Sequence, residues 1–509
     1  MNEATITFVR QHADDDVRQL ALYAKHGEDV DLKAALQQIQ GRQTARKKLP
    51  TWAACDAILY PPHLSMEQCS SEQTARYKAT VVAKLLQPAI DTIETIETIE
   101  TMASIASMPS PQESTLIDLT GGFGVDFSFM APLFTKAVYV ERQEALCRLA
   151  RHNLHALGLH HTEVVCADSE AYLDTIPSPI KTEQAPFTYT SKSNQAPLPS
   201  GGAGGGFFPS GGVGGGFFPS GGAGGGFFPS GGAGGGSQGG SQRYGTRIFF
   251  LDPARRNEQG GRTYGISDCT PDVLALRDEL LRKADYVVLK LSPMLDWRKT
   301  VDDLGRNHVS QVHIVATGNE VKELLVVLQS QADALTVTCE NDGTRFSTTI
   351  ETIEAIDAIE AIETIETIEA IEAIEAIDAI ETIGSIKSMA SFPYLYEPNA
   401  AIMKGGFFAE LSARYGVNQI AQNSHLFVSE QRVEGFPGRE FRIKAVTTMN
   451  KKELKKALQG IAQANITVRN FPLSVAELRK RLKISEGGST YIFATTLAHG
   501  EHLLFICEK

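Results

Sequence analysis

The chain has 509 residues, of which 42% are hydrophobic, so it is long enough for two or three domains with buried cores. It contains no run of 18 apolar residues, which argues against a membrane-spanning helix. The net charge is −12, but 15 acidic residues and no basic ones lie in the repeats Asp91–Thr101 and Ile350–Ile383; without them it would be +3. The overall acidity therefore says little about the charge of a binding partner.

The seven cysteines are scattered along the chain and form no CxxC pair. This pattern is typical of reduced thiols in a cytoplasmic protein and gives little support to a metal or iron–sulfur site. The segment Met1–Gln11 lacks the basic-then-apolar pattern of a secretory leader. We therefore expect a cytoplasmic protein with no metal and no membrane partner.

Residues 1–90 are predicted to form an N-terminal helical region, because Asp14–Tyr23 and Val30–Gln38 place apolar residues three and four positions apart. Basic residues then gather in Gly41–Lys48, just before Trp52. An exposed tryptophan beside a basic run could contact a base and a phosphate. The alternative is a solvated helix face. Further on, Ser65–Lys78 is predicted to be a helix capped by a serine at position 70 or 71.

Three segments of low complexity interrupt the chain. Residues 91–112 form an acidic repeat linker, residues 178–243 a glycine-rich insertion, and residues 345–388 a second acidic insertion. Isoleucines at a period of three drift by about 60° per repeat around a helix, so no apolar face results. Dense glycine is typical of a flexible coil. We expect these segments to lie outside the packed domains.

A glycine-rich turn follows the apolar run that ends in Asp118, within the stretch LIDLTGGFGVD. The turn contains Thr120, Gly121, Gly122 and Gly124. The pattern predicts a strand that enters a helix through a turn with free backbone N–H groups, where glycines let a ligand approach closely. Its GGxG spacing differs from the GxGxxG of dinucleotide sites. A tight connection without any ligand is the alternative.

Acidic residues stand at the ends of four predicted strands. The later three strands are Ala137–Val140, Glu163–Cys166 and Arg247–Leu251. The four acids are Asp118, Glu141, Asp168 and Asp252. Ligands of open α/β sheets bind at the edge where the strands end, so we expect these four residues along one binding edge. Asp252 could instead only cap the turn that follows it.

The pattern of strands and helices predicts an α/β fold with a parallel sheet over residues 113–335. Ala284–Leu291 and Gln311–Ala316 are apolar and are predicted to be further strands. Glu320–Leu328 is predicted to be a helix.

The glycine turn and the four acids together resemble the class I S-adenosylmethionine-dependent methyltransferases, which have a Rossmann-like sheet. The resemblance implies S-adenosyl-L-methionine as cofactor, with Glu141 on the ribose and Asp168 on the adenine amine. The implied cofactor-binding residues are Asp118, Thr120, Gly121, Gly122, Gly124, Glu141, Asp168 and Ser169. The helix predicted at Ser65–Lys78 is similar to one in cap-hypermethylating RNA-guanine methyltransferases, although it lacks their proline. Its place implies a lid over the methionine end of the cofactor.

The stretch Asp252-Pro253-Ala254-Arg255 stands where amine methyltransferases carry D/N-P-P followed by an aromatic residue. The implied catalytic residues are Asp252, Pro253 and Arg255. Asp252 and the Pro253 carbonyl would hold the amine, and Arg255 would stack on the base in place of the aromatic ring. A D-P-P-R motif occurs in uracil C5-methyltransferases, but these need a cysteine nucleophile after the next strand, where this chain has Lys290-Leu291-Ser292-Pro293. The two nearest cysteines in sequence, Cys269 and Cys339, lie elsewhere in the pattern.

Residues 439–483 hold twelve Lys or Arg against three Glu, a net charge of +9. Such a basic module suits a phosphate backbone, although a solvated charged surface is the alternative. Helices are predicted at Asn450–Ala464 and Ser474–Leu482, with strands at Asn465–Asn470, Tyr491–Leu497 and His502–Cys507. The predicted RNA-binding residues are Lys451, Lys452, Lys455, Lys456, Arg479, Lys480, Arg481 and Lys483.

The stretches YLYEPNAAIMK, FPGREFRI and YIFATT carry a second resemblance, to a bacterial family of methyltransferases with small C-terminal domains. It implies a ferredoxin-like module at residues 389–435 and a THUMP-like RNA-binding domain at residues 436–509. The expected activity is methylation of an exocyclic base amine, of the guanine N2 type, in a ribosomal or transfer RNA. An RNA-binding protein with an inactive methyltransferase fold remains the alternative from another class.

Overall fold

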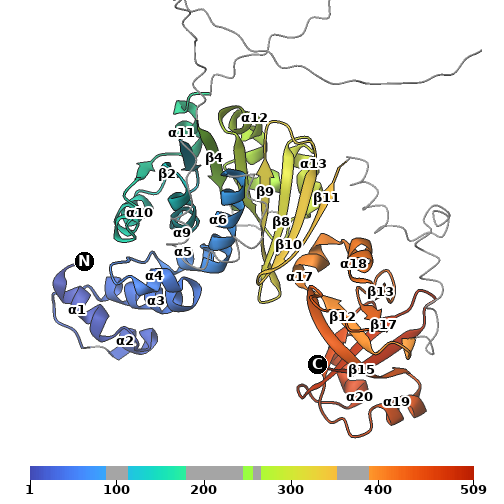
Figure 1. The fold of residues 1–509 in the computed structure, drawn as a ribbon. Coiled ribbons are helices and arrows are strands. Elements are labelled where there is room, and N and C mark those ends of the chain that lie inside the picture. The colour runs from blue at the N-terminus through green and yellow to red at the C-terminus, as the bar shows by residue number, and fades with distance from the viewer. Residues whose placement is uncertain (24, 87–112, 179–244, 256–264, 352–388) are drawn as a thin grey trace, which may run out of the picture. The chain divides into compact units, whose positions relative to one another are not determined.

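The computed structural model describes the chain except for residues 24, 87–112, 179–244, 256–264 and 352–388 (Figure 1). The linker at residues 91–112, nearly all of the glycine-rich insertion and most of the second acidic insertion lie outside the described residues. None of the described helices is both long and apolar enough to span a membrane.

The N-terminal region is helical. Its described helices are α1 (Glu3–Gln11), α2 (Val17–Tyr23), α3 (Leu32–Lys48), α4 (Pro50–Ala54), α5 (His63–Gln68) and α6 (Glu72–Leu86). The single helix predicted at Ser65–Lys78 is wrong in its start, because Ser65 belongs to α5. The cap at Ser71 is confirmed, since its Oγ accepts the backbone N–H of Thr74 at 3.2 Å.

The prediction of an exposed Trp52 beside the basic run is also wrong. Trp52 is 1% exposed and its Nε1 donates a hydrogen bond to Ser128 Oγ at 3.2 Å. The basic side chains around it have partners within the protein: Arg42 pairs with Asp56, and Lys48 Nζ donates to the Met66 carbonyl at 2.9 Å. The apolar ring therefore packs into the core, which removes the base-stacking surface that the sequence suggested.

Nine described strands form one sheet in the order β11-β10-β8-β9-β7-β4-β1-β2-β3. They are β1 (Ser114–Asp118), β2 (Lys136–Glu141), β3 (Thr162–Cys166), β4 (Thr246–Leu251), β7 (Tyr286–Leu291), β8 (Val309–Thr317), β9 (Glu320–Leu328), β10 (Leu335–Asn341) and β11 (Thr344–Ile350). The strands β3, β2, β1, β4 and β7 are mutually parallel. Since β11 ends at Ile350, the sheet extends beyond the predicted domain end at residue 335. The acidic insertion predicted at residues 345–388 is therefore wrong in its start, because its first residues belong to a paired strand.

The helix predicted at Glu320–Leu328 is wrong. The segment is strand β9, which pairs antiparallel with both β7 and β8. Its side chains from Glu323 to Leu328 are all buried, because helices cover both faces of the sheet there. A strand buried on both faces shows no alternation of polar and apolar residues, so its sequence resembles that of a buried helix.

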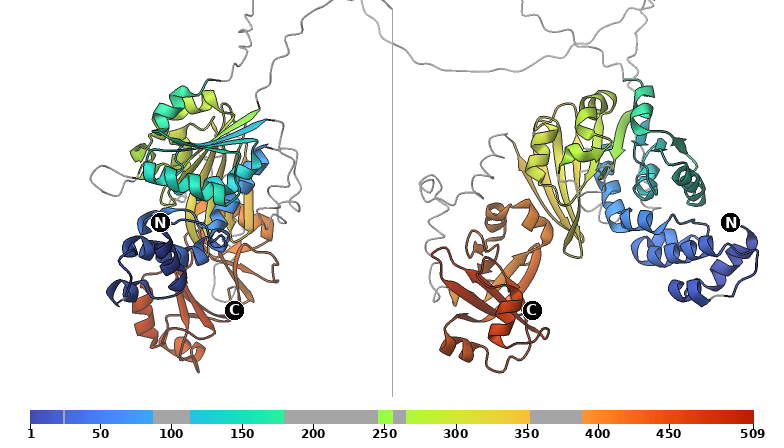
Figure 2. Two further views of the ribbon diagram at one scale, coloured as in Figure 1. Left: turned by 90° about the vertical axis from the view of Figure 1, so that its left-hand side faces the viewer. Right: turned by 180° about the vertical axis from the view of Figure 1, so that it is seen from behind.

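Alternate residues of each central strand enter two different cores. Leu116 of β1 and Phe250 of β4 pack with helices α6, α9 (Val125–Met130) and α10 (Glu144–Ala156). Ile117 and Phe249, one position away, pack on the other face with α11 (Ser169–Thr175), α12 (Val273–Lys283) and α13 (Trp297–Leu304). Figure 2 shows helices on both faces of the sheet. This layering brings the carboxyl ends of β1 to β4 to one edge.

The C-terminal part builds a second sheet in the order β13-β14-β12-β15-β18-β17-β16. Its first segments are β12 (Tyr394–Pro398), α17 (Ala400–Gly405), α18 (Phe408–Tyr415), β13 (Asn418–Gln419) and β14 (Phe427–Ser429). The later ones are β15 (Gly438–Thr448), α19 (Lys451–Ala457), β16 (Asn465–Val468), α20 (Val475–Leu482), β17 (Thr490–Thr496) and β18 (His502–Glu508). Helix α19 ends at Ala457, before the predicted Ala464, and the positive φ of Gly460 prevents the helix from continuing further along the chain.

One buried carboxylate ties the two halves of this sheet together. Glu397 of β12 is 3% exposed. Its Oε2 accepts a hydrogen bond from Arg439 Nε of β15 at 2.8 Å, and its Oε1 accepts one from Arg469 Nη2, just after β16, at 2.8 Å. A buried carboxylate needs such partners, so the pairing fixes β12 against the later strands.

Candidate active site and nucleic-acid interface

The four predicted acids lie at one edge of the large sheet. Asp118 ends β1, Glu141 ends β2, Asp168 lies two residues after the end of β3, and Asp252 follows β4 directly. Since these strands are adjacent and parallel in the order β3-β2-β1-β4, the structure brings the four residues to the same edge. The local pattern of strand and acid was therefore sufficient to locate this edge.

The glycine turn lies against β2. Gly122 and Gly124 have φ values of +56° and +85°, which favour glycine. A Cβ atom at Gly121 would lie only 2.2 Å from Cε2 of Tyr139, so the ring leaves no room for a side chain there. Glu141, 8% exposed, accepts the backbone N–H of Gly122 at 3.0 Å. The turn and Glu141 therefore hold each other in place.

Thr120 connects the first and fourth strands at this edge. Its Oγ1 accepts the backbone N–H of Asp252 at 2.6 Å, and its own N–H donates to Asp118 Oδ1 at 2.9 Å. Asp118 is 1% exposed. Burial, and then the nearby carboxylates of Asp126 and Asp252, raise the pKa of Asp118 well above its usual value. Asp118 thus holds the glycine turn through its hydrogen bond with Thr120.

Asp168 and Ser169 lie at the start of helix α11. Asp168 is exposed and caps the helix, because its Oδ1 accepts the backbone N–H groups of Glu170 at 3.0 Å and Ala171 at 3.4 Å. Ser169 is the first residue of the helix. These capping hydrogen bonds hold the Asp168 side chain at the carboxyl edge of the sheet, where β3 lies next to β2 and Glu141.

Lys290, at the end of β7, reaches the candidate catalytic residue Asp252. Its Nζ lies 2.5 Å from Asp252 Oδ2 and 3.8 Å from Asp126 Oδ2. On the other side of Asp126, Oδ1 lies 3.3 Å from Nζ of Lys78, which also pairs with Glu323. Two lysines and three carboxylates thus form a chain of charges from the interior to the edge, with Asp252 as its outer end.

No motif in the sequence assigns a role to Lys290, Asp126, Lys78 or Glu323. The available signal was Lys290 itself, a charged residue within the apolar run VVLKL of a buried strand. A buried ammonium requires an anion, so such a residue points to a paired carboxylate nearby. Which carboxylate it meets depends on the sheet order and was not visible in the sequence.

The other residues of the predicted catalytic motif lead into a short two-stranded ribbon. Pro253 is buried, and Ala254–Arg255 forms strand β5, which pairs antiparallel with β6 (Cys269–Thr270). Arg255 lies opposite Cys269. Cys269 stands before β7 and not after it, where a uracil C5-type nucleophile is needed, and it is only 7% exposed. The distance of 14 positions in sequence hid a pairing that a short ribbon creates.

The predicted RNA-binding residues lie on two helices of the second sheet. Lys451, Lys452, Lys455 and Lys456 are exposed on α19, which has no buried residue. On and after α20, Lys480, Arg481 and Lys483 are exposed, while Arg479 lies 3.7 Å from Glu486. The structure thus leaves seven of these eight side chains open to a ligand, and only Arg479 is largely covered.

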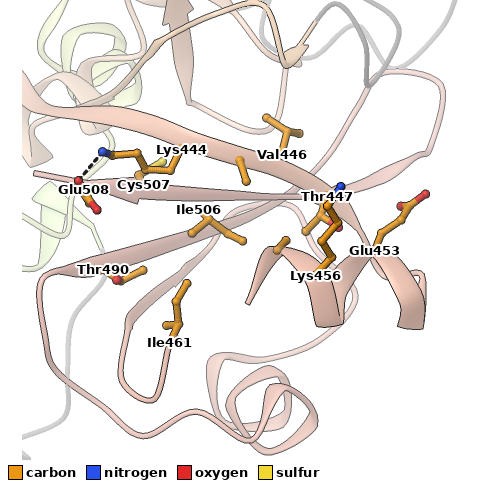
Figure 3. A pocket seen from close by; sticks show the side chains of 12 residues that line it. Lys444, Val446, Thr447, Glu453, Lys456, Ile461, Thr490, Ile506, Cys507 and Glu508 are labelled. Atoms are coloured by element: carbon orange, nitrogen blue, oxygen red, sulfur yellow. Dashed lines mark ion pairs between the residues drawn. The ribbon is translucent and has the colours of Figure 1, made fainter. Parts of the chain in front are cut away.

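A hollow of about 620 Å³ lies between α19 and strands β15 and β18 (Figure 3). Its base is formed by small and branched apolar side chains, among them Val446, Ile461 and Ile506. Lys456 borders the hollow at the helix, and Lys444 borders it at the strand, where it pairs with Glu508 at 2.7 Å. One of the predicted RNA-binding lysines therefore stands beside a concave surface.

No group of three or more potential metal ligands occurs among the described residues.

Two domain families match the C-terminal part of the chain. A ferredoxin-like domain matches residues 394–437, and a THUMP domain-like family matches residues 438–509. Both modules that the sequence resemblance implied are confirmed. No curated protein matches the sequence.

The chain is similar over nearly its whole length to the solved structure of a protein from Porphyromonas gingivalis W83 assigned as a methyltransferase. The TM-score is 0.66 at 25% identity, over 99% of this chain and 97% of that one. An rRNA methylase from Streptococcus thermophilus matches at 14% identity and a TM-score of 0.24, over 45% of this chain and 94% of its own. At that score the second match carries no weight. The predicted α/β fold with a Rossmann-like methyltransferase sheet is confirmed.

Proposed function

We propose that this protein uses S-adenosyl-L-methionine to methylate an exocyclic amine of an RNA base. The observation that carries the proposal is the edge of the large sheet, where Asp252-Pro253 follow β4 beside the glycine turn and Glu141. The overall similarity to a protein assigned as a methyltransferase supports it. The guanine N2 amine is the first candidate, because the helix upstream of the turn resembles that of RNA-guanine methyltransferases.

The residues of the turn fit this cofactor. A Cβ atom at Gly122 would meet only the Thr120 carbonyl oxygen, at 3.6 Å, so the main chain is open to a ligand there. Glu141 accepts one backbone N–H on each oxygen, from Gly122 and from Gln143, and its remaining lone pairs can accept the ribose hydroxyls. Asp168 would hold the adenine amine. When bound, S-adenosyl-L-methionine supplies the methyl group from its sulfonium centre.

The role of Asp252 is to orient the amine. An exocyclic NH₂ has two N–H donors, which Asp252 and the Pro253 carbonyl would accept. With both donors held, the nitrogen lone pair points at the methyl group, and this orientation supplies most of the rate. Because Lys290 pairs with Oδ2 of Asp252, Oδ1 is the oxygen left for the amine.

The THUMP-like domain would hold the RNA. Its match to the domain family and the exposed lysines of α19 support this. Lysines grip phosphates without reading sequence, so the domain would position the RNA and leave the choice of base to the active site. The partner is then a ribosomal or transfer RNA.

Uracil C5 methylation is the second candidate, because Cys269 lies opposite Arg255. That reaction needs an exposed thiolate to open the pyrimidine ring. The 7% exposure of Cys269 makes it a poor nucleophile. Amine methylation is therefore favoured.

The test is methyl transfer from labelled S-adenosyl-L-methionine to RNA from cells that lack the gene, followed by mass spectrometry of the nucleosides. We expect a methylated amine, and we expect Cys269→Ala to keep the activity. A 5-methyluridine product that disappears in Cys269→Ala would establish the second candidate. RNA binding with no methyl transfer to any RNA would favour a protein with an inactive methyltransferase fold.

A further inference from the structure

Lys290 is a largely buried cation near the end of an apolar strand. Its side chain is 12% exposed, and its neighbours on β7, Leu289 and Leu291, belong to the core. Ordering and desolvating an ammonium at such a position costs free energy unless a carboxylate pairs with it closely. The structure therefore raises the question of which carboxylate Lys290 serves.

Distances and burial single out Asp252. Lys290 Nζ is 2.5 Å from Asp252 Oδ2 but 3.8 Å from Asp126 Oδ2. Asp126 already has other partners, because Ser70 Oγ donates to its Oδ2 at 2.7 Å and Lys78 lies 3.3 Å from its Oδ1. Burial disfavours the charge of Asp126, but Lys78 and Lys290 outweigh it and lower its pKa. Asp126 therefore does not depend on Lys290 alone, since Lys78 lies closer to it.

Asp252 differs from these inner residues in its exposure. Its side chain is 40% exposed, whereas that of Asp126 is 10% exposed. An ion pair contributes little to stability for a carboxylate this exposed, so the position of Asp252 does not need the pair for stability. What the pair does fix is geometry: the backbone of Asp252 is held by Thr120, and its carboxylate is held by Lys290.

We infer that Lys290 is a positioning residue that orients the Asp252 carboxylate toward the substrate amine. This inference rests on the proposed function. With the ammonium on Oδ2, rotation about the side chain of Asp252 is restricted, and Oδ1 is presented in one direction. The carboxylate would then accept the hydrogen bond of the amine on Oδ1, while Lys290 does not touch the amine itself.

The experiment compares single-turnover and steady-state methyl transfer to RNA in four variants: Lys290→Met, Lys290→Arg, Asp252→Ala and the double variant Lys290→Met/Asp252→Ala. We expect Lys290→Met to lower kcat by roughly 10- to 100-fold, with the KM for RNA and the Kd for S-adenosyl-L-methionine nearly unchanged. Lys290→Arg should restore part of the rate, since a guanidinium can also bind Oδ2.

The double variant gives the decisive readout. If Lys290 acts through Asp252, the double variant should be no slower than Asp252→Ala alone, because the lysine has nothing left to orient. A loss in the double variant equal to the product of the two single losses would mean that Lys290 acts on the substrate directly, and it would overturn the inference. So would wild-type kcat in Lys290→Met.

Lys283 provides a matched control. Its side chain is 7% exposed and it pairs with Glu279 at 2.6 Å, on helix α12, away from Asp252. Lys283→Met should lower the stability as a buried lysine would and leave kcat unchanged. Equal kcat losses in Lys283→Met and Lys290→Met would mean that Lys290 has only a structural role. Wild-type protein that methylates no RNA would overturn the proposed function itself, and the positioning role with it, whereas an active wild type with an equally active Lys290→Met overturns only the latter.

Discussion

The edge of the large sheet and the basic face of the THUMP-like domain treat their charged residues in opposite ways. At the edge, Glu141 accepts two backbone N–H groups and Asp252 pairs with Lys290. On α19, within the described part of the chain, no ion pair involves Lys451, Lys452, Lys455 or Lys456. The charges at the edge are fixed before a ligand arrives, while those on α19 remain free to move.

Under the proposed function, this difference separates two tasks. Chemistry needs a fixed direction, because a misplacement of about 1 Å can cost roughly 100-fold in rate. Gripping a phosphate backbone needs charge and reach, but little direction. Variants at the two places should therefore fail in different assays, and they can sharpen or break the comparison.

The largest effect is expected at Asp252. Asp252→Ala should lower methyl transfer by at least ~100-fold, since the amine loses its orientation. RNA and cofactor should bind as in the wild type. The rate is measured with labelled cofactor and bulk RNA, and binding of each ligand is measured in parallel. A variant that loses cofactor binding as well would show that Asp252 mainly supports the turn through Thr120.

Glu141→Ala should have the next largest effect. A lost hydrogen bond to a charged group costs about 1.5–3 kcal/mol, which weakens S-adenosyl-L-methionine about 10- to 100-fold. Calorimetry on the purified protein measures the affinity. Glu144→Ala is the control, because Glu144 pairs on the surface with Arg148 of the same helix. Unchanged affinity in Glu141→Ala would show that Glu141 does not bind the ribose.

A smaller effect is expected on α19. Replacing Lys451, Lys452, Lys455 and Lys456 by Gln should weaken RNA binding and flatten its salt dependence, by about one unit of slope for each lost phosphate contact. Filter binding over a salt series measures both. Cofactor affinity should stay at the wild-type value. A variant with the wild-type slope would mean that the RNA is held by other residues.

The smallest effect at neutral pH is expected at His313 of β8, which is buried against Tyr77. Burial, and then Lys84 and Arg345, lower the pKa of His313 to about 3. In the unfolded chain His313 takes up a proton near pH 6.5. Its contribution to the free energy of unfolding is therefore fully present above that pH and is lost as the pH falls toward 3. At pH 5 the contribution lost is about 2 kcal/mol. Denaturant unfolding at pH 7 and pH 5 should therefore show a smaller difference in His313→Gln than in the wild type.

Local patterns in the sequence were sufficient for the strand ends of the large sheet. The glycine turn, Glu141 and Asp252 could each be found because an apolar run, a turn and an acid lie within a few positions. The helices with serine caps, such as α20 after Ser474, could be found for the same reason. What such patterns cannot contain is the partner of each residue.

The partners depend on the order of the strands. Lys290 meets Asp252 only because β7 lies next to β4, and Cys269 meets Arg255 only through a short ribbon. The burial of Trp52 could not be predicted for the same reason. Its basic neighbours in sequence suggested an exposed surface, whereas its contact with Ser128 of α9 places it in the core. Burial on both faces hid β9, because it removes the alternation by which a strand is recognised.

The shared C-terminal sheet has a consequence for how this protein can be divided in evolution or in the laboratory. The boundary between the two matched domain families, after residue 437, falls between β12 and β15, which are hydrogen-bonded neighbours. A THUMP-like half made alone would expose the long edge of β15 and leave Arg439 and Arg469 without Glu397. Such an open edge invites pairing with another chain. The two halves should therefore be inherited, expressed and transplanted as one cassette, with the cut placed before Tyr394.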